Sequence, residues 1–167
     1  MPWLRIRKNQ HHPNSLLTKT NKRLLWTIFV AAALAAMFWF LNFYKDSDNP
    51  SVTLRVGNTE LNVEIADSPE ERQQGLSGRD KLPNNQGMLF IFESEGLYNF
   101  WMKDMKFPID IVWIDSSGRI IYLKENIGPD TYPELFSPDK PARYVLEVNA
   151  GWVAKNSIAI GNTLHFK

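Results

Sequence analysis

The chain has 167 residues and contains no cysteine. This absence excludes a disulfide scaffold, catalysis by a thiol and metal sites built from thiolates. Histidine is nearly absent from residues 51–167, where only His165 occurs. A Ser/His/Asp triad would depend on that one residue, and a zinc site needs three or four ligands. We therefore predict that the protein holds no metal and no cofactor.

Acidic residues are absent from residues 1–23, which carry Arg5, Arg7, Lys8, Lys19, Lys22 and Arg23. Residues 51–167 carry 12 Lys or Arg against 16 Asp or Glu, which gives a net charge of −4. The overall charge of +1 therefore hides the difference between a basic N-terminal part and an acidic C-terminal part. Because nucleic-acid binding requires a basic face, the acidic part predicts no nucleic-acid partner.

No charged side chain occurs in residues 24–44 (LLWTIFVAAALAAMFWFLNFY), between Arg23 and Lys45. A helix of about 20 apolar residues spans the hydrocarbon core of a bilayer. Trp26 near one end, and Trp39 and Tyr44 near the other, suit the headgroup zones. A buried core helix would carry a polar stripe, which this segment lacks. We expect residues 24–44 to cross a membrane, with the lipid bilayer as partner.

The orientation follows from the basic tail, because an excess of Lys and Arg marks the cytoplasmic side. A cleaved signal peptide is the alternative, but its apolar region should be short and end at small residues. Here the alanines lie in the middle of the run, so an uncleaved signal anchor is favoured. The predicted parts are a cytoplasmic tail (1–23), the anchor (24–44), a linker (45–50) and an extracytoplasmic domain (51–167), periplasmic in a Gram-negative host.

The outer domain shows the patterns of short strands. Residues 52–56 and 61–65 alternate apolar and polar side chains around Gly57-Asn58, as in a β-hairpin. The run Ser68-Pro69-Glu70-Glu71 predicts the capping box of a short helix. Further strands are expected in 88–92, 97–102, 109–115, 119–123, 142–148 and 163–166, and the hairpin 109–123 should be central and covered on both faces. A long irregular segment, 124–141, contains four prolines. The fold class is mainly β: a β-sandwich or partly open barrel of about seven to eight short strands with one or two short helices, preceded by one transmembrane helix.

Five ordered blocks carry a family resemblance: PEERQQGLSGR (69–79), GMLFIF (87–92), FWMKD (100–104), PIDIVWID (108–115) and PARYVLEVNAGW (141–152). Together they resemble domain-of-unknown-function family 192 (DUF 192), across essentially all of residues 51–167. The resemblance implies a mostly β, sandwich-type domain that is often exported or membrane-tethered. It implies no catalytic roles, since the activity of the family is not established. The family tends to have Asn at the position of Asp104 and Gly-Asp at the position of Gly161-Asn162.

Carboxylates are the remaining candidates for catalysis. Asp110 and Glu147 each lie among apolar neighbours, where a charge is costly unless it is paired. One interpretation is a structural ion pair with Lys103 or Arg143. The other is a carboxylate-dependent hydrolase acting on an envelope glycan, with Asp104 as a further candidate. That hypothesis requires two acids facing one cleft, about 5–10 Å apart.

An aromatic stretch supplies candidates for binding. If residues 98–103 are extended, Tyr98 and Phe100 share one face while Trp101 and Lys103 share the other. Trp101 is either a core residue or, with Lys103, part of a groove floor; Tyr98 and Asp110 are weaker binding candidates. The favoured function is a non-enzymatic envelope-associated module that binds a glycan or a protein. The alternatives are the hydrolase and a structural membrane subunit that acts through its helix.

Overall fold

The computed structural model describes residues 17–45 and 51–166, and it describes the side chains of the N-terminal helix over residues 23–40. These residues belong to two separate units, a helix and a β domain. The predicted tail up to residue 16 and the linker residues 46–50 lie outside the described residues.

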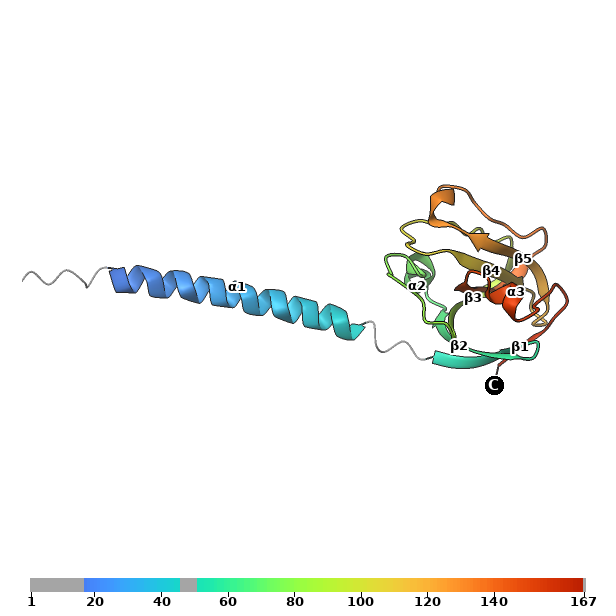
Figure 1. Ribbon diagram of the computed structural model, residues 1–167, viewed down its shortest axis with the longest axis horizontal. Helices are drawn as coiled ribbons and strands as arrows, with labels where there is room; N and C mark the ends of the chain where they lie inside the picture. The colour runs from blue at the N-terminus through green and yellow to red at the C-terminus, as the bar shows by residue number, and fades with distance from the viewer. Residues whose placement is uncertain (1–16, 46–50, 167) are drawn as a thin grey trace, which may run out of the picture. The chain divides into compact units, whose positions relative to one another are not determined.

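The helix α1 (Leu17–Lys45) is the first unit (Figure 1). Its segment Arg23–Phe40 is long and apolar enough to cross a membrane, and none of that segment is buried by protein. Large apolar side chains such as Trp26, Phe29 and Trp39 are mostly exposed. The helix begins seven residues before the predicted span because the apolar pattern marks only the part that lipid would cover.

The β domain is one mixed sheet of seven strands that curves into a half-barrel (Figure 1). The strands are β1 (Ser51–Val56), β2 (Thr59–Ala66), β3 (Gln86–Gly96), β4 (Ile109–Ile114), β5 (Ile120–Ile127), β6 (Ala142–Asn149) and β7 (Leu164–Phe166). Their order is β5-β4-β6-β3-β2-β1-β7, and β2 and β3 form the parallel pair. This confirms the predicted mainly β fold, in its partly open barrel form.

Three short helical segments interrupt the sheet: α2 (Pro69–Gln74), η1 (Pro129–Thr131) and α3 (Trp152–Lys155). The predicted capping box is present at the start of α2. The Ser68 hydroxyl oxygen accepts from the Glu71 N–H at 3.2 Å, and the Glu71 carboxylate accepts from the Ser68 N–H at 3.0 Å. The two bonds satisfy N–H groups that a helix start leaves without partners, which is why this polar segment holds a helix.

Each face of the sheet carries an apolar cluster. The first contains Leu54, Leu89, Val112, Leu146 and Val148 and is covered by Trp152 and Val153 of α3. The second contains Met88, Phe90, Ile111, Trp113 and Val145 and is covered by Leu76, Leu82, Met102 and Phe136 from the loops. All six residues of β4 are buried, as predicted for a strand covered on both faces. The same prediction is wrong for β5, which is an edge strand whose residues 121–123 are only partly buried.

The predicted strand over residues 97–102 is also wrong, because only Phe100 makes a β-bridge, with Phe136. Ring packing fixes this segment instead of a ladder of hydrogen bonds. The Tyr98 ring stacks on Phe92 with centroids 3.5 Å apart. The Phe100 ring packs edge-on against Phe90 and Trp113, at 4.8 Å and 6.1 Å. The segment therefore crosses over the second cluster as part of its cover.

Candidate functional site

Asp110 lies in β4 and has no exposed surface. Its carboxylate accepts three backbone N–H bonds: from Asn126 at 2.8 Å, from Gly151 at 3.1 Å and from Val153 at 3.0 Å. These donors come from the end of β5 and the start of α3. Asp110 therefore joins β4, β5 and α3, and its partners are backbone amides rather than Lys103 or Arg143. A carboxylate sealed and satisfied in this way has no access to a ligand in solution.

Glu147 lies in β6, where it is 5% exposed and sits between Met88 of β3 and Ile111 of β4 in the register. Burial raises the pKa of Glu147 to about 8, and the positive charge of Arg79 opposes that rise. Within the described part of the chain, no Lys or Arg nitrogen lies within 4.0 Å of this carboxylate. Arg79 binds Glu64 instead, through two contacts of 2.6 and 2.7 Å. The protonated carboxyl is the form that suits this apolar site.

The register places the two acids on opposite faces of the sheet. Asp110 is paired with Val148, whereas its neighbour Ile111 is paired with Glu147. Successive residues of a strand point to opposite faces, so Asp110 lies on the α3 side and Glu147 on the other. The sheet itself separates the two carboxyl groups. They do not face one cleft, as the hydrolase hypothesis requires.

Trp101 and Lys103 lie at the surface, on the side of the 97–103 segment away from the core. The Trp101 ring is 47% exposed, while its neighbours Phe100 and Met102 pack in the second cluster. The Lys103 ammonium lies 5.8 Å from the centroid of the Trp101 ring, and the Tyr132 ring lies 5.7 Å from it. Tyr98 does not join them, because it stacks on Phe92 and donates to the Ser94 carbonyl at 2.7 Å. Of the predicted binding residues, Trp101 and Lys103 are thus brought together.

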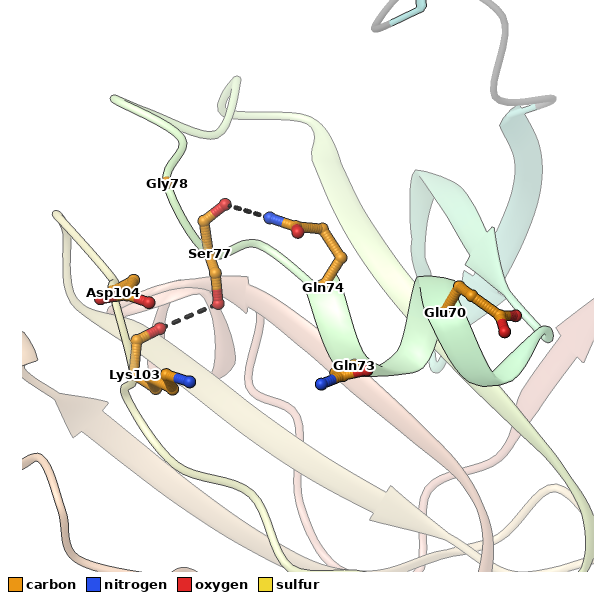
Figure 2. A pocket seen from close by; sticks show the side chains of 7 residues that line it. All are labelled: Glu70, Gln73, Gln74, Ser77, Gly78, Lys103 and Asp104. Atoms are coloured by element: carbon orange, nitrogen blue, oxygen red, sulfur yellow. Dashed lines mark hydrogen bonds between the residues drawn. The ribbon is translucent and has the colours of Figure 1, made fainter.

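A pocket of about 480 Å³ opens beside Lys103, between α2 and the turn at residues 103–104 (Figure 2). It is lined by Glu70, Gln73, Gln74, Ser77, Gly78, Lys103 and Asp104. Two hydrogen bonds join its walls: the Ser77 hydroxyl donates to the Lys103 carbonyl at 2.8 Å, and the Gly78 N–H donates to the Asp104 carbonyl at 2.9 Å. Asp104 is thus a pocket residue, separate from the two buried acids.

Sequence reasoning missed the α2 side of this pocket. The PEERQQGLSGR block contains Gln73, Gln74, Ser77 and Gly78, but its polar residues indicated only a capped surface helix. Asp104 has a φ of 56°, in the left-handed region that Asp and Asn adopt more readily than most residues. The Asn found at this position in the resembled family fits the same backbone requirement.

Comparisons with known proteins identify the family of the β domain. Residues 52–166 match the model of DUF192, a family described as an uncharacterized ACR. A crystal structure from Sinorhizobium meliloti 1021, described as a proposed transcription regulator, is 32% identical with a TM-score of 0.68, and the match covers 71% of this chain and 95% of that one. A protein of unknown function from Novosphingobium aromaticivorans DSM 12444 is 26% identical with a TM-score of 0.65, covering 69% and 84%. The search of curated proteins gave no match.

Proposed function

This chain belongs to the DUF192 family, and from that premise we propose that it is a membrane-anchored binding module of the cell envelope. In this proposal α1 holds the chain in the bilayer with its N-terminus in the cytoplasm. The β domain lies on the extracytoplasmic side and binds an envelope component, a glycan or a protein. The binding surface consists of Trp101, Lys103 and the adjoining pocket, and no reaction is catalysed.

The anchoring rests on the composition of α1 and its flanks. The segment Arg23–Phe40 has the length and the apolar character of a spanning helix. Basic residues precede it and no acid does, and this asymmetry favours an N-terminus in the cytoplasm. An outer domain with a net charge of −4 also suits a partner other than nucleic acid. The description of the Sinorhizobium meliloti protein as a transcription regulator is therefore not carried over to this chain.

The observation that carries the binding role is the exposed ring of Trp101. Large aromatic side chains supply much of the buried area of a small core, so a half-exposed tryptophan beside a pocket favours recognition. Aromatic residues are enriched at interfaces, where a flat ring offers large contact area at little cost in conformational entropy. Lys103 adds a cation next to the ring and also lines the pocket. Lys103 therefore links the exposed ring to the pocket.

Catalysis by the acids has less support. Asp110 and Glu147 are buried on opposite faces of the sheet. Within the pocket, Glu70 and Asp104 stand at opposite ends, and Glu70 points away from Asp104 (Figure 2). Carboxylate-dependent cleavage of a glycosidic bond needs two carboxyl groups that flank that bond. Neither pair meets that requirement.

The binding role predicts that substitutions at the exposed surface weaken the capture of an envelope component. The full chain in detergent micelles is immobilised and exposed to a panel of purified envelope polymers and solubilised envelope proteins. We expect at least one component to be retained, and Trp101→Ala or Lys103→Ala to weaken its retention about tenfold, the loss of one strong interface residue.

Phe166→Ala is the matched control, because Phe166 is a 52% exposed aromatic residue of β7 that does not line the pocket. That variant should retain the component as the parent chain does. Retention of nothing, or retention that neither Trp101→Ala nor Lys103→Ala changes, would refute the binding role.

A further inference from the structure

We infer that the ligand of this binding surface is an oligosaccharide of N-acetylated hexosamine units, with one sugar ring on Trp101 and an acetamido group in the pocket. The inference rests on the proposed function and names its ligand class. Three features of the described residues carry it: the polar lining of the pocket, the lining side chains that make no hydrogen bond, and the exposed Trp101 ring next to Lys103.

The lining of the pocket has no apolar side chain. Apart from Gly78, every lining residue carries an amide, a carboxylate, a hydroxyl or an ammonium group. An apolar ligand would strip water from these groups without replacing the lost hydrogen bonds, which is unfavourable. The volume of about 480 Å³ lies within the range of small-molecule sites. A compact ligand rich in hydrogen-bonding groups fits these properties.

The lining side chains divide into those that shape the wall and those that remain open to a ligand. The Gln74 amide donates to the Ser77 carbonyl at 2.8 Å, and the Ser77 hydroxyl donates to the Lys103 carbonyl. Within residues 51–166, the side chains of Gln73, Lys103 and Asp104 make no hydrogen bond to another residue. Figure 2 shows the Lys103 ammonium and the Gln73 amide pointing toward one another across the pocket. Two donor groups and the Asp104 carboxylate are therefore available, while the Glu70 carboxylate, which also makes no hydrogen bond within residues 51–166, points away from Asp104 (Figure 2).

An acetamido group complements this set. Its carbonyl accepts a hydrogen bond and its N–H donates one, in fixed and opposed directions. Lys103 and Gln73 can donate to the carbonyl, and the Asp104 carboxylate can accept from the N–H. A hydroxyl at the same sugar position is smaller and carries its donor and its acceptor on one atom, not on separate N–H and carbonyl groups. The pocket should therefore distinguish an N-acetylated sugar from one that carries only hydroxyl groups.

Trp101 provides the platform beside the pocket. Its ring is 47% exposed, and Lys103, which lies 5.8 Å from the ring centroid, is also a lining residue. One face of a pyranose ring presents C–H groups of weak positive charge, which pack on the negative face of an indole. Stacking on Trp101 would thus orient a chain of sugars whose next substituent enters the pocket.

The charge of the site narrows the class of glycan. Glu70 and Asp104 contribute two negative charges and Lys103 one positive charge, so the lining is negative overall. Glycans rich in carboxylate or phosphate would be repelled, as they would by the negative charge of the whole domain. Uncharged N-acetylated sugars incur no such repulsion.

The test compares two trisaccharides that differ only at the position of interest. Chitotriose carries acetamido groups where cellotriose carries hydroxyl groups on an otherwise equivalent chain. Binding of each to the full chain in lipid nanodiscs is measured by isothermal titration calorimetry. We expect saturable binding of chitotriose, at least about tenfold tighter than that of cellotriose.

The variants separate the two parts of the site. Trp101→Ala should weaken chitotriose and cellotriose alike, by about tenfold, because both lose the stacked ring. Gln73→Ala should weaken chitotriose selectively and so reduce the preference. Phe166→Ala should change neither. Gln73 and Trp101 are surface residues, so folding of these variants can be verified by their unchanged circular dichroism.

Two results would overturn the ligand class: equal affinity for the two trisaccharides, or no measurable binding of chitotriose. If the envelope panel still yields a component whose capture depends on Trp101, the binding role stands and only the hexosamine assignment fails. If capture from that panel is also independent of Trp101 and Lys103, both proposals fail together.

Discussion

Replacing Asp110 with alanine is expected to lower the free energy of unfolding of the β domain by more than about 4 kcal/mol. The substitution leaves three backbone N–H groups, of Asn126, Gly151 and Val153, without their acceptor. A buried donor without a partner costs about 1–3 kcal/mol; the Val153 bond is buried and the other two are partly buried, and a small void adds to the cost. The total is comparable with the whole stability of many domains, about 5–15 kcal/mol.

The comparison variants are Asp110→Asn and Asp139→Ala. Each full chain is unfolded by urea in micelles, and tryptophan fluorescence reports the unfolding. The asparagine keeps one acceptor oxygen but turns an NH₂ group toward a backbone donor, so its loss should be intermediate. Asp139 is exposed, and its replacement should change stability by less than about 0.5 kcal/mol. If Asp110→Ala were as mild as Asp139→Ala, the structural role of Asp110 would be wrong.

Glu147 is expected to make the domain less stable as the pH rises. The usual pKa of a glutamate carboxyl is 4.5, and burial raises that of Glu147 to about 8 in the folded protein. Between these values the folded state holds a proton that the unfolded state has released. The free energy of unfolding therefore falls by about 1.4 kcal/mol per pH unit as the pH rises. The Glu147 contribution is fully present below pH 4.5, falls across this window and levels off above pH 8.

Glu147→Gln removes the titrating group and keeps its shape. The difference in unfolding free energy between wild type and variant should grow in favour of the variant from pH 5 to 8, by about 4 kcal/mol. Glu125→Gln, at an exposed position of β5, should keep the wild-type slope. A Glu147→Gln variant with the wild-type slope would contradict the protonated state of Glu147.

Local signals in the sequence predicted most of the fold. The capping box of α2 needs four consecutive residues, and it forms as predicted. The alternation in residues 52–65 likewise gives β1 and β2 with the expected hairpin. Prediction failed over residues 97–102, where ring packing against residues distant in sequence replaces strand pairing. It also could not show that β5 lies at an edge, because strand order depends on long-range pairing.

In the candidate site, too, local patterns could be predicted from the sequence and long-range contacts could not. The period of two within residues 98–103 predicted that Trp101 and Lys103 share a face, but it could not decide whether that face is core or surface. The relation of Asp110 to Glu147 was not predictable, because it depends on the register of β4 against β6. The pocket could not be predicted from the sequence either, because it forms only where Ser77 and Gly78 bind the turn at 103–104. Those bonds join segments about 26 residues apart in the chain.

Cysteine labelling measures most directly whether the Trp101 surface faces the envelope. The chain has no cysteine of its own, so only an introduced cysteine can react. Full-length Trp101→Cys and Ser15→Cys variants are treated with a membrane-impermeant maleimide in cells whose inner membrane is sealed and whose outer layers are permeable. We predict that position 101 is labelled at once and position 15 only after the membrane is opened. Labelling of position 15 in sealed cells, with position 101 protected until lysis, would contradict the extracytoplasmic binding role.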